Sequence, residues 1–149
     1  MKVVIASDHG GFRLKSEIIK YLDIKNIEYE DLGAFSEESV DYPDFGQAVG
    51  EAVASGKFDR GIVICGTGIG ISIAANKVTG VRAALCGDCF SAKASREHNN
   101  ANVLALGERV IGVELAKMIV DIWLQTEFAG GRHERRVNKI KAIEEKYGK

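Results

Sequence analysis

The sequence predicts an α/β fold in which helices cover both faces of a five-stranded parallel sheet. Five short runs of apolar, mostly β-branched residues recur along the chain, and segments with apolar residues at helical spacing separate them. Strands that alternate with helices form right-handed βαβ units, whose parallel sheet is buried on both faces. The predicted strands are residues 3–6, 27–32, 61–65, 81–85 and 103–106.

The first part of the chain predicts two strands and two helices. Residues 3–6 are all apolar, which is typical of a buried strand, and the polar segment that follows ends it. Residues 12–22 carry apolar side chains at helical spacing, whereas residues 27–32 alternate as a half-exposed strand does. Pro43, the only proline, suits the first turn of a helix that continues through Val53.

The remainder predicts three further strands, each followed by a helix. The apolar strand at 61–65 leads into a glycine-rich segment, and the strands at 81–85 and 103–106 also end in short polar segments. An apolar stripe that includes Trp123 marks the helix after the fifth strand. The predicted helices of this part are 69–77, 89–97, 113–124 and 133–147.

Size and composition indicate one cytoplasmic domain spanning residues 1–149. A chain of 149 residues with 46% hydrophobic and 28% charged residues is typical of a globular protein with a sizeable core. The net charge of −1 implies no general affinity for nucleic acid or for an acidic membrane surface. Three cysteines without a signal peptide fit a reducing compartment, and the first apolar run is too short to span a membrane.

The predicted fold also predicts where a ligand binds. In open parallel sheets, ligands bind outside the carboxyl ends of the strands. Residues with polar or reactive side chains follow directly on four of the predicted strands. These segments are 8–9, 65–70, 86–88 and 107–109.

The segment Cys65-Gly66-Thr67-Gly68-Ile69-Gly70 is the most informative of them. Glycines let a ligand approach the backbone, and the helix that follows offers unpaired N–H groups to an anion. No Walker A loop is present, and Ile71 replaces the last glycine of the dinucleotide fingerprint. Nucleotide binding, with Asp88 as the ribose-binding acid, and a tight turn without a ligand remain alternatives.

Cys65 stands where a thiol can be chemically active. A cysteine at a strand end is often only a small buried hydrophobe. Here a helix N-terminus follows, which favours the thiolate, and the loop N–H groups could stabilise a developing oxyanion. Cys86 and Cys89 have the spacing of a redox dithiol, but Pro43 lies in the wrong setting for the proline-bearing loop of such a site, which favours two structural cysteines that flank a turn.

Two histidine motifs and a basic segment each allow a structural and a functional interpretation. Asp8-His9 is either a helix cap with a surface histidine or part of a site. His98-Asn99-Asn100 is either a helix C-cap or a second contribution to that site. Arg132 and Arg136 share a helix face, as a solvated surface or as a phosphate clamp that Arg109 could join.

Together these residues resemble the ribose-5-phosphate isomerase B family, which includes subunits of galactose-6-phosphate isomerase. The resemblance covers essentially the whole chain and rests on the segments 7–11, 65–72, 74–77, 82–85, 98–102 and 107–109. It implies a three-layer αβα Rossmann-like fold, a homodimer with clefts between the subunits, and no metal or organic cofactor. The implied reaction interconverts an aldose phosphate and a ketose phosphate through a cis-enediolate.

The resemblance also implies a role for each site residue. Cys65 matches the proton-abstracting base, because the other branch of the family has a glutamate where this chain has Ile71. Thr67 and His98 match the residues that open the furanose ring. The positions that match substrate contacts are Asp8, His9, Gly66, Gly68, Ile69, Gly70, Asn99, Arg109, Arg132 and Arg136.

Substrate and assembly remain open at this level. The expected substrate is D-ribose 5-phosphate, with D-ribulose 5-phosphate as product and allose 6-phosphate as a further substrate. The alternative is a subunit of galactose-6-phosphate isomerase, although one partner of such enzymes commonly lacks part of the catalytic set. We expect a homodimer, and the sequence leaves open whether dimers pair further.

Overall fold

The computed structural model describes residues 1–148 and contains the expected parallel sheet. Its five strands lie in the order β2-β1-β3-β5-β4, and every neighbouring pair is parallel. The predicted fold class is therefore confirmed. The strands are β1 (Lys2–Ser7), β2 (Glu28–Asp31), β3 (Arg60–Cys65), β4 (Ala83–Leu85) and β5 (Val103–Gly107).

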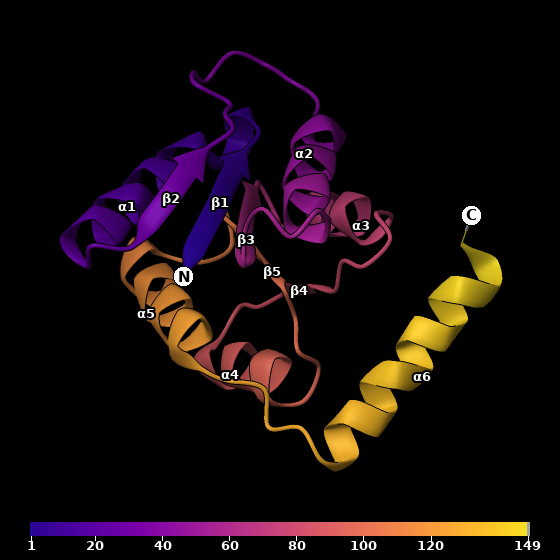
Figure 1. Ribbon diagram of the computed structural model, residues 1–149. Helices are drawn as coiled ribbons and strands as arrows, with labels where there is room; N and C mark the ends of the chain where they lie inside the picture. Colours follow the sequence, from indigo (N-terminus) through magenta and orange to yellow (C-terminus); the bar gives the residue numbers. More distant parts are fainter. Residues whose placement is uncertain (149) are drawn as a thin grey trace.

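Helices form a layer on each face of the sheet (Figure 1). Helices α1 (Phe12–Ile24), α4 (Cys89–Glu97) and α5 (Val113–Gln125) cover one face. Helices α2 (Tyr42–Ala54) and α3 (Ile69–Asn76) cover the other face. None of the helices in residues 1–148 combines the length and the apolar character that crossing a membrane requires.

The core is divided by the sheet because side chains alternate along each strand. Val3 and Ile5 of β1 pack with α1 and α5, whereas Val4 and Ala6 of the same strand pack with α2 and α3. Trp123 of α5 is completely buried in the first cluster. Both layers therefore hold the strands, and with them the residues that follow the strands, in fixed positions.

Two local features differ from the prediction. Strand β4 begins at Ala83 rather than at residue 81, because the N–H groups of the two preceding residues bond elsewhere. The Val81 N–H donates to the Val78 carbonyl, and the Arg82 N–H donates to Oδ1 of Asn102. A short 3₁₀ turn, η1 (His9–Gly11), also precedes α1 and was not predicted.

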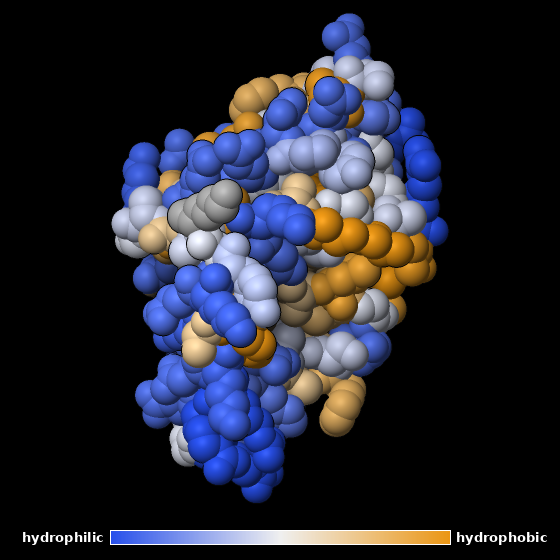
Figure 2. Space-filling view, turned by 90° about the vertical axis from the view of Figure 1, so that its right-hand side faces the viewer, coloured by the Kyte–Doolittle hydropathy of each residue, from blue (hydrophilic) through white to orange (hydrophobic). Residues whose placement is uncertain are grey.

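The last helix, α6 (Arg132–Tyr147), stands apart from the two layers (Figure 1). Val137 is its one buried residue, and Glu144 accepts a hydrogen bond from the Gly80 N–H. Ile140, Ile143 and Tyr147 are 45%, 60% and 73% exposed. On this side of the molecule, Figure 2 shows an apolar patch bordered by hydrophilic side chains, which lies at the height of α3 rather than along α6. Helix α6 therefore presents apolar side chains for which residues 1–148 provide little cover.

Candidate active site

Cys65 ends β3, and its thiol lies against the start of α3. The residue is only 5% exposed, and its Sγ accepts a hydrogen bond from the Gly68 N–H at 3.1 Å. Gly68 has φ +79°, and a Cβ there would lie 2.5 Å from Cδ1 of Leu85. Only glycine fits this position, because it combines positive φ with a close neighbour. The turn thus directs a backbone N–H donor at the sulfur.

Thr67 and the first residues of α3 surround the thiol on its open side. Thr67 is exposed, and its Oγ1 accepts a hydrogen bond from the Ile69 N–H at 3.2 Å. Gly107 allows the loop to lie close to β5, since a Cβ there would be 2.5 Å from the Thr67 carbonyl oxygen. The N–H groups of Gly68 and Ile69 are therefore engaged, and the N–H of Gly70 belongs to the first turn of α3, which has no partner within the helix.

The turn after β5 brings Arg109 to the same loop. The Glu108 N–H donates to the Cys65 carbonyl, and the Arg109 N–H donates to the Gly66 carbonyl, both at 3.0 Å. The Arg109 guanidinium lies against Gly66, where a Cβ would be 3.5 Å from Nη1. Arg109 is exposed, so its charge is available to an anionic ligand beside the loop.

Asp8 and His9 approach the loop from β1. Asp8 is buried and caps the 3₁₀ turn, since its Oδ1 accepts a hydrogen bond from the Gly11 N–H at 3.0 Å. Nδ1 of His9 accepts one from the Val40 N–H at 3.1 Å. A Cβ on Gly10 would lie 3.3 Å from the Gly66 nitrogen, so the two turns touch. We call Asp8, His9, Cys65, Arg109 and the loop Gly66–Gly70 the carboxyl-edge group.

His98 and Asn99 lie elsewhere. They follow α4, which runs back from the carboxyl ends of the strands to their amino ends. The Arg82 guanidinium, directly before β4, donates hydrogen bonds to the carbonyls of Asn99 and Asn100. Asn100 adopts φ +47°, so the left-handed C-cap interpretation of this turn is confirmed.

The start of α6 joins this turn. The rings of His98 and His133 stack, with centroids 4.4 Å apart and 14° between their planes. Desolvation, followed by the charges of His98, Arg132 and Arg136, lowers the pKa of His133. Arg132 and Arg136 flank His133 on α6 and are exposed. We call His98, Asn99, Arg132 and Arg136 the amino-edge group.

One chain does not bring the two groups together. Cys65 pairs with Gly107 at one end of the β3–β5 ladder, whereas Gly61 pairs with Val103 at the other end. Four residue steps along a strand span roughly 13 Å. The turn that holds His98 lies beside the second end, where the Asn102 carbonyl accepts a hydrogen bond from the Gly61 N–H. Cys65 and His98 of one chain therefore lie at opposite edges of the sheet.

Two buried arginines support the amino-edge group, and the sequence analysis missed them. Arg96 donates to the carbonyls of Ala101 and Thr126 and to Oδ1 of Asn100. Arg60 donates to the Thr126 carbonyl from the other side. Burial, with a further contribution from the Arg60 charge, lowers the pKa of Arg96 to about 10. A single arginine in a polar helix gives no sequence signal for such a role, because its contact with Thr126 lies 30 residues along the chain.

The structure weakens two alternatives. Asp88 caps α4 through hydrogen bonds from the Ser91 N–H at 2.7 Å and the Ser91 hydroxyl at 2.9 Å, which lower the pKa of its carboxyl. This role disfavours Asp88 as a ribose-binding acid. Burial raises the pKa of the Cys86 thiol, which disfavours a reactive dithiol with Cys89. Within residues 1–148, no group of three or more His, Cys, Asp or Glu side chains could hold a metal ion.

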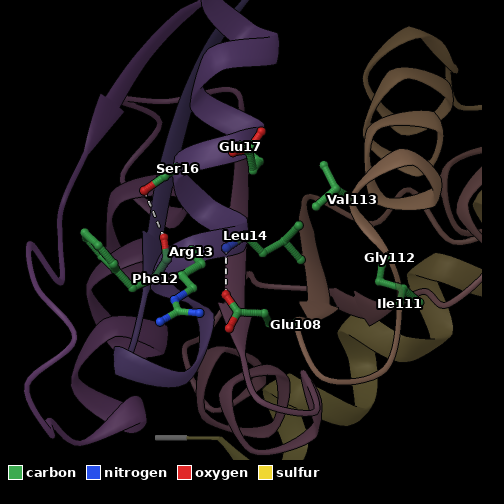
Figure 3. A pocket seen from close by; sticks show the side chains of 9 residues that line it. All are labelled: Phe12, Arg13, Leu14, Ser16, Glu17, Glu108, Ile111, Gly112 and Val113. Atoms are coloured by element: carbon green, nitrogen blue, oxygen red, sulfur yellow. Dashed lines mark hydrogen bonds between the residues drawn. The ribbon is translucent and has the colours of Figure 1, made fainter.

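A cavity of about 530 Å³ adjoins the carboxyl-edge group between α1 and the turn after β5 (Figure 3). None of the predicted site residues lines it, but Glu108 and Leu14 do. A smaller cavity of about 290 Å³ is lined by Thr67 and Ile69 among others. The predicted site itself is thus open at the edge of the sheet.

The fold and the carboxyl-edge group define a class of protein first. An open, all-parallel αβα sheet with a glycine loop at its carboxyl ends is a ligand-binding fold of the Rossmann-like class. Residues 3–140 then match the family described as Ribose/Galactose Isomerase, so the chain belongs to that family.

Known proteins of this family resemble the chain over nearly its whole length. Ribose-5-phosphate isomerase B of Escherichia coli is 53% identical over 145 residues, which cover 97% of each chain. The structure of the Clostridium thermocellum enzyme has 62% identity and a TM-score of 0.98, and covers 99% of this chain and 100% of its own. That of Mycoplasma genitalium, with bound ribulose-5-phosphate, has 44% identity and a TM-score of 0.92, with 97% and 96% covered.

Proposed function

We propose that the protein interconverts D-ribose 5-phosphate and D-ribulose 5-phosphate. The observation that carries this proposal is the near-complete coverage of the chain by proteins named ribose-5-phosphate isomerase B, one of them with ribulose-5-phosphate bound. The names of these relatives do not favour the galactose-6-phosphate isomerase alternative. Allose 6-phosphate remains a further candidate substrate.

Cys65 is the base in the proposed mechanism. Its thiolate removes the proton from C2 of the open-chain aldose, which leaves a cis-enediolate, and then returns the proton to C1, while the hydroxyl proton of O2 moves to O1. The Gly68 N–H on Sγ supports the thiolate before the transfer. The N–H groups of Gly66, Thr67 and Gly70 stabilise the enediolate oxygens, and one such donor contributes about 3–4 kcal/mol to the transition state.

Ring opening precedes this proton transfer, because most of the sugar is cyclic in solution. We assign it to the exposed imidazole of His98, whose ring nitrogens can both donate and accept a proton, together with the exposed Thr67 hydroxyl. Asp8 and His9 bind the sugar hydroxyl groups, and Asn99 assists the glycine loop. Arg109, Arg132 and Arg136 hold the phosphate, and its binding energy orients the reacting carbons.

These assignments require two copies of the chain. The carboxyl-edge group holds Cys65 and the amino-edge group holds His98, and roughly 13 Å of strand separates the edges that they occupy. In a twofold homodimer, the amino-edge group of each subunit completes the site of the other, so that two equivalent sites form. The exposed Ile140, Ile143 and Tyr147 of α6 provide apolar surface for such an interface. Pairing of two dimers would bury further surface.

We place the proposed isomerase in the cytoplasm, and its activity can be tested on the purified chain. All three cysteines are free, which fits the reducing cytoplasm. The purified chain, assayed alone, should isomerise ribose 5-phosphate, with allose 6-phosphate, galactose 6-phosphate and plain ribose as comparisons. Turnover of galactose 6-phosphate in preference to ribose 5-phosphate, or of neither, would refute the proposal. A light-scattering mass of one chain at assay concentrations would refute the shared site.

A further inference from the structure

Glu108 lies at the carboxyl edge of the sheet, but the proposed mechanism assigns it no role. It follows directly on β5, is half-buried, and precedes Arg109. Its side chain reaches across to α1, where Oε1 accepts a hydrogen bond from the Leu14 N–H at 2.6 Å (Figure 3). Glu108 thus connects two segments that lie 94 residues apart.

Helix α1 needs this contact, because it has no cap of its own. Gly11 occupies the N-cap position and has no side chain to accept a hydrogen bond. Leu14 is the third residue of the helix, so its N–H has no partner within the helix. A carboxylate at this position satisfies the donor and interacts favourably with the helix dipole. Glu108 is therefore the N-terminal cap of α1, supplied by another segment.

Backbone hydrogen bonds also connect Glu108 and its neighbour Arg109 to the end of β3, which carries the Cys65 thiol. The Glu108 N–H donates to the Cys65 carbonyl, and the Arg109 N–H donates to the Gly66 carbonyl. The segments that carry Asp8, Cys65 and Arg109 therefore meet at one residue. The carboxylate of Glu108 is held on α1, while the Arg109 guanidinium lies against Gly66.

We propose that Glu108 is a positioning residue for the isomerase site, which acts by holding Arg109 at the glycine loop. This role rests on the proposed function, in which Arg109 binds the substrate phosphate. The hydrogen bond to Leu14 fixes the turn after β5 against α1. When that anchor is lost, the Arg109 backbone and side chain gain freedom, and the phosphate loses a preorganised contact.

Three single variants test the anchor. Glu108→Ala removes the acceptor and should lower kcat/KM for ribose 5-phosphate about 10- to 100-fold, mainly through KM. Glu108→Gln keeps an acceptor of the same length and should stay within about threefold of the wild type. Glu17→Ala is the matched control, since Glu17 lies on the rim of the same cavity and pairs only with Lys20 on the surface (Figure 3). It should leave kcat/KM unchanged.

A double-mutant cycle separates positioning from a general structural role. If Glu108 acts through Arg109, then Glu108→Ala should cost less than about threefold in an Arg109→Ala background. The same cycle, measured by titration with inorganic phosphate, gives a binding readout without catalysis. Additive losses, equal damage by Gln and Ala at position 108, or equal behaviour of Glu108→Ala and Glu17→Ala would each overturn the proposal.

The proposed function is tested separately by the wild-type rate. Hydrogen exchange at the Leu14 amide should become faster in Glu108→Ala and stay at the wild-type rate in Glu108→Gln, whether or not the chain is an isomerase. An inactive wild type would refute the proposed isomerase activity. An unchanged rate of hydrogen exchange at the Leu14 amide in Glu108→Ala would refute the capping role of Glu108.

Discussion

The carboxyl-edge group and the amino-edge group are built in different ways. The first is held by the backbone: Cys65 is buried, and glycines at positions 66, 68 and 107 bring its loop into close contact with neighbouring segments. The second consists of exposed side chains at helix ends, and the side chains of Arg82 and Arg96 bond to the backbone of the turn that follows α4. The proton-transfer part of the proposed site is therefore preorganised within one chain, whereas the proposed ring-opening and phosphate-binding part depends on longer side chains and on assembly.

The largest expected effect falls on the carboxyl-edge group. Cys65→Ala should reduce kcat by at least about 10²-fold, because it removes the proposed base, and should leave KM largely unchanged. Cys89→Ala, at a half-buried cysteine outside both groups, is the control and should be far milder. Steady-state kinetics with ribose 5-phosphate measure both, and near-normal turnover of the Cys65 variant would contradict the assignment.

The next largest effect tests the amino-edge group. Arg136→Ala removes a charge-assisted contact and should cost about 1.5–3 kcal/mol of binding, which is about a 10- to 150-fold rise in KM for ribose 5-phosphate. Plain ribose lacks the phosphate and should show little change. Arg135→Ala, also exposed on α6, serves as the matched control. Equal losses on ribose and ribose 5-phosphate would exclude a phosphate contact.

Subunit exchange tests whether the two groups meet across an interface. Cys65→Ala damages one group and His98→Asn damages the other. A mixed dimer of the two variants then holds one doubly damaged site and one intact site, so it should regain about half of the normal activity. Exchange is followed with a tag on one variant. If mixed dimers form and no activity returns, Cys65 and His98 do not belong to one shared site.

The fold and the carboxyl-edge group could be predicted because their determinants are local. The period of apolar residues identifies the strands and helices, and the strand-end rule then places Asp8, Cys65 and Arg109 at one edge. The start of β4 was missed by two residues, because the Arg82 N–H donates to the side chain of Asn102 rather than to the backbone of a neighbouring strand.

The amino-edge group could be predicted only in part. His98 ends a helix that follows a strand, so the parallel fold itself implies that α4 carries it to the opposite edge from Cys65, whereas no sequence pattern indicates that the start of α6 packs against it. The supporting contacts of Arg96 reach 30 residues along the chain to Thr126, and no spacing rule indicates them. The position of α6 depends on few contacts within residues 1–148, so local patterns say little about it.

The smallest expected effect concerns the histidine pair of the amino-edge group. Desolvation first, then the charges of His98, Arg132 and Arg136, lower the pKa of His133 in the folded chain, whereas Glu97 acts in the opposite direction. The histidine therefore binds a proton more readily in the unfolded chain, where its pKa is about 6.5. The contribution of His133 to the free energy of unfolding is complete above that pH, and it is lost as the pH falls from there toward the lower pKa of the folded chain.

His133→Asn removes this contribution, and its Tm should fall slightly less than that of the wild type between about pH 7.5 and 5.5. Thermal unfolding in a buffer without phosphate, which would bind the neighbouring arginines, measures the difference. An identical dependence of Tm on pH in both proteins would show that the surroundings do not disfavour the charged form of His133. The stacked pair would then contribute to the amino-edge group through packing alone.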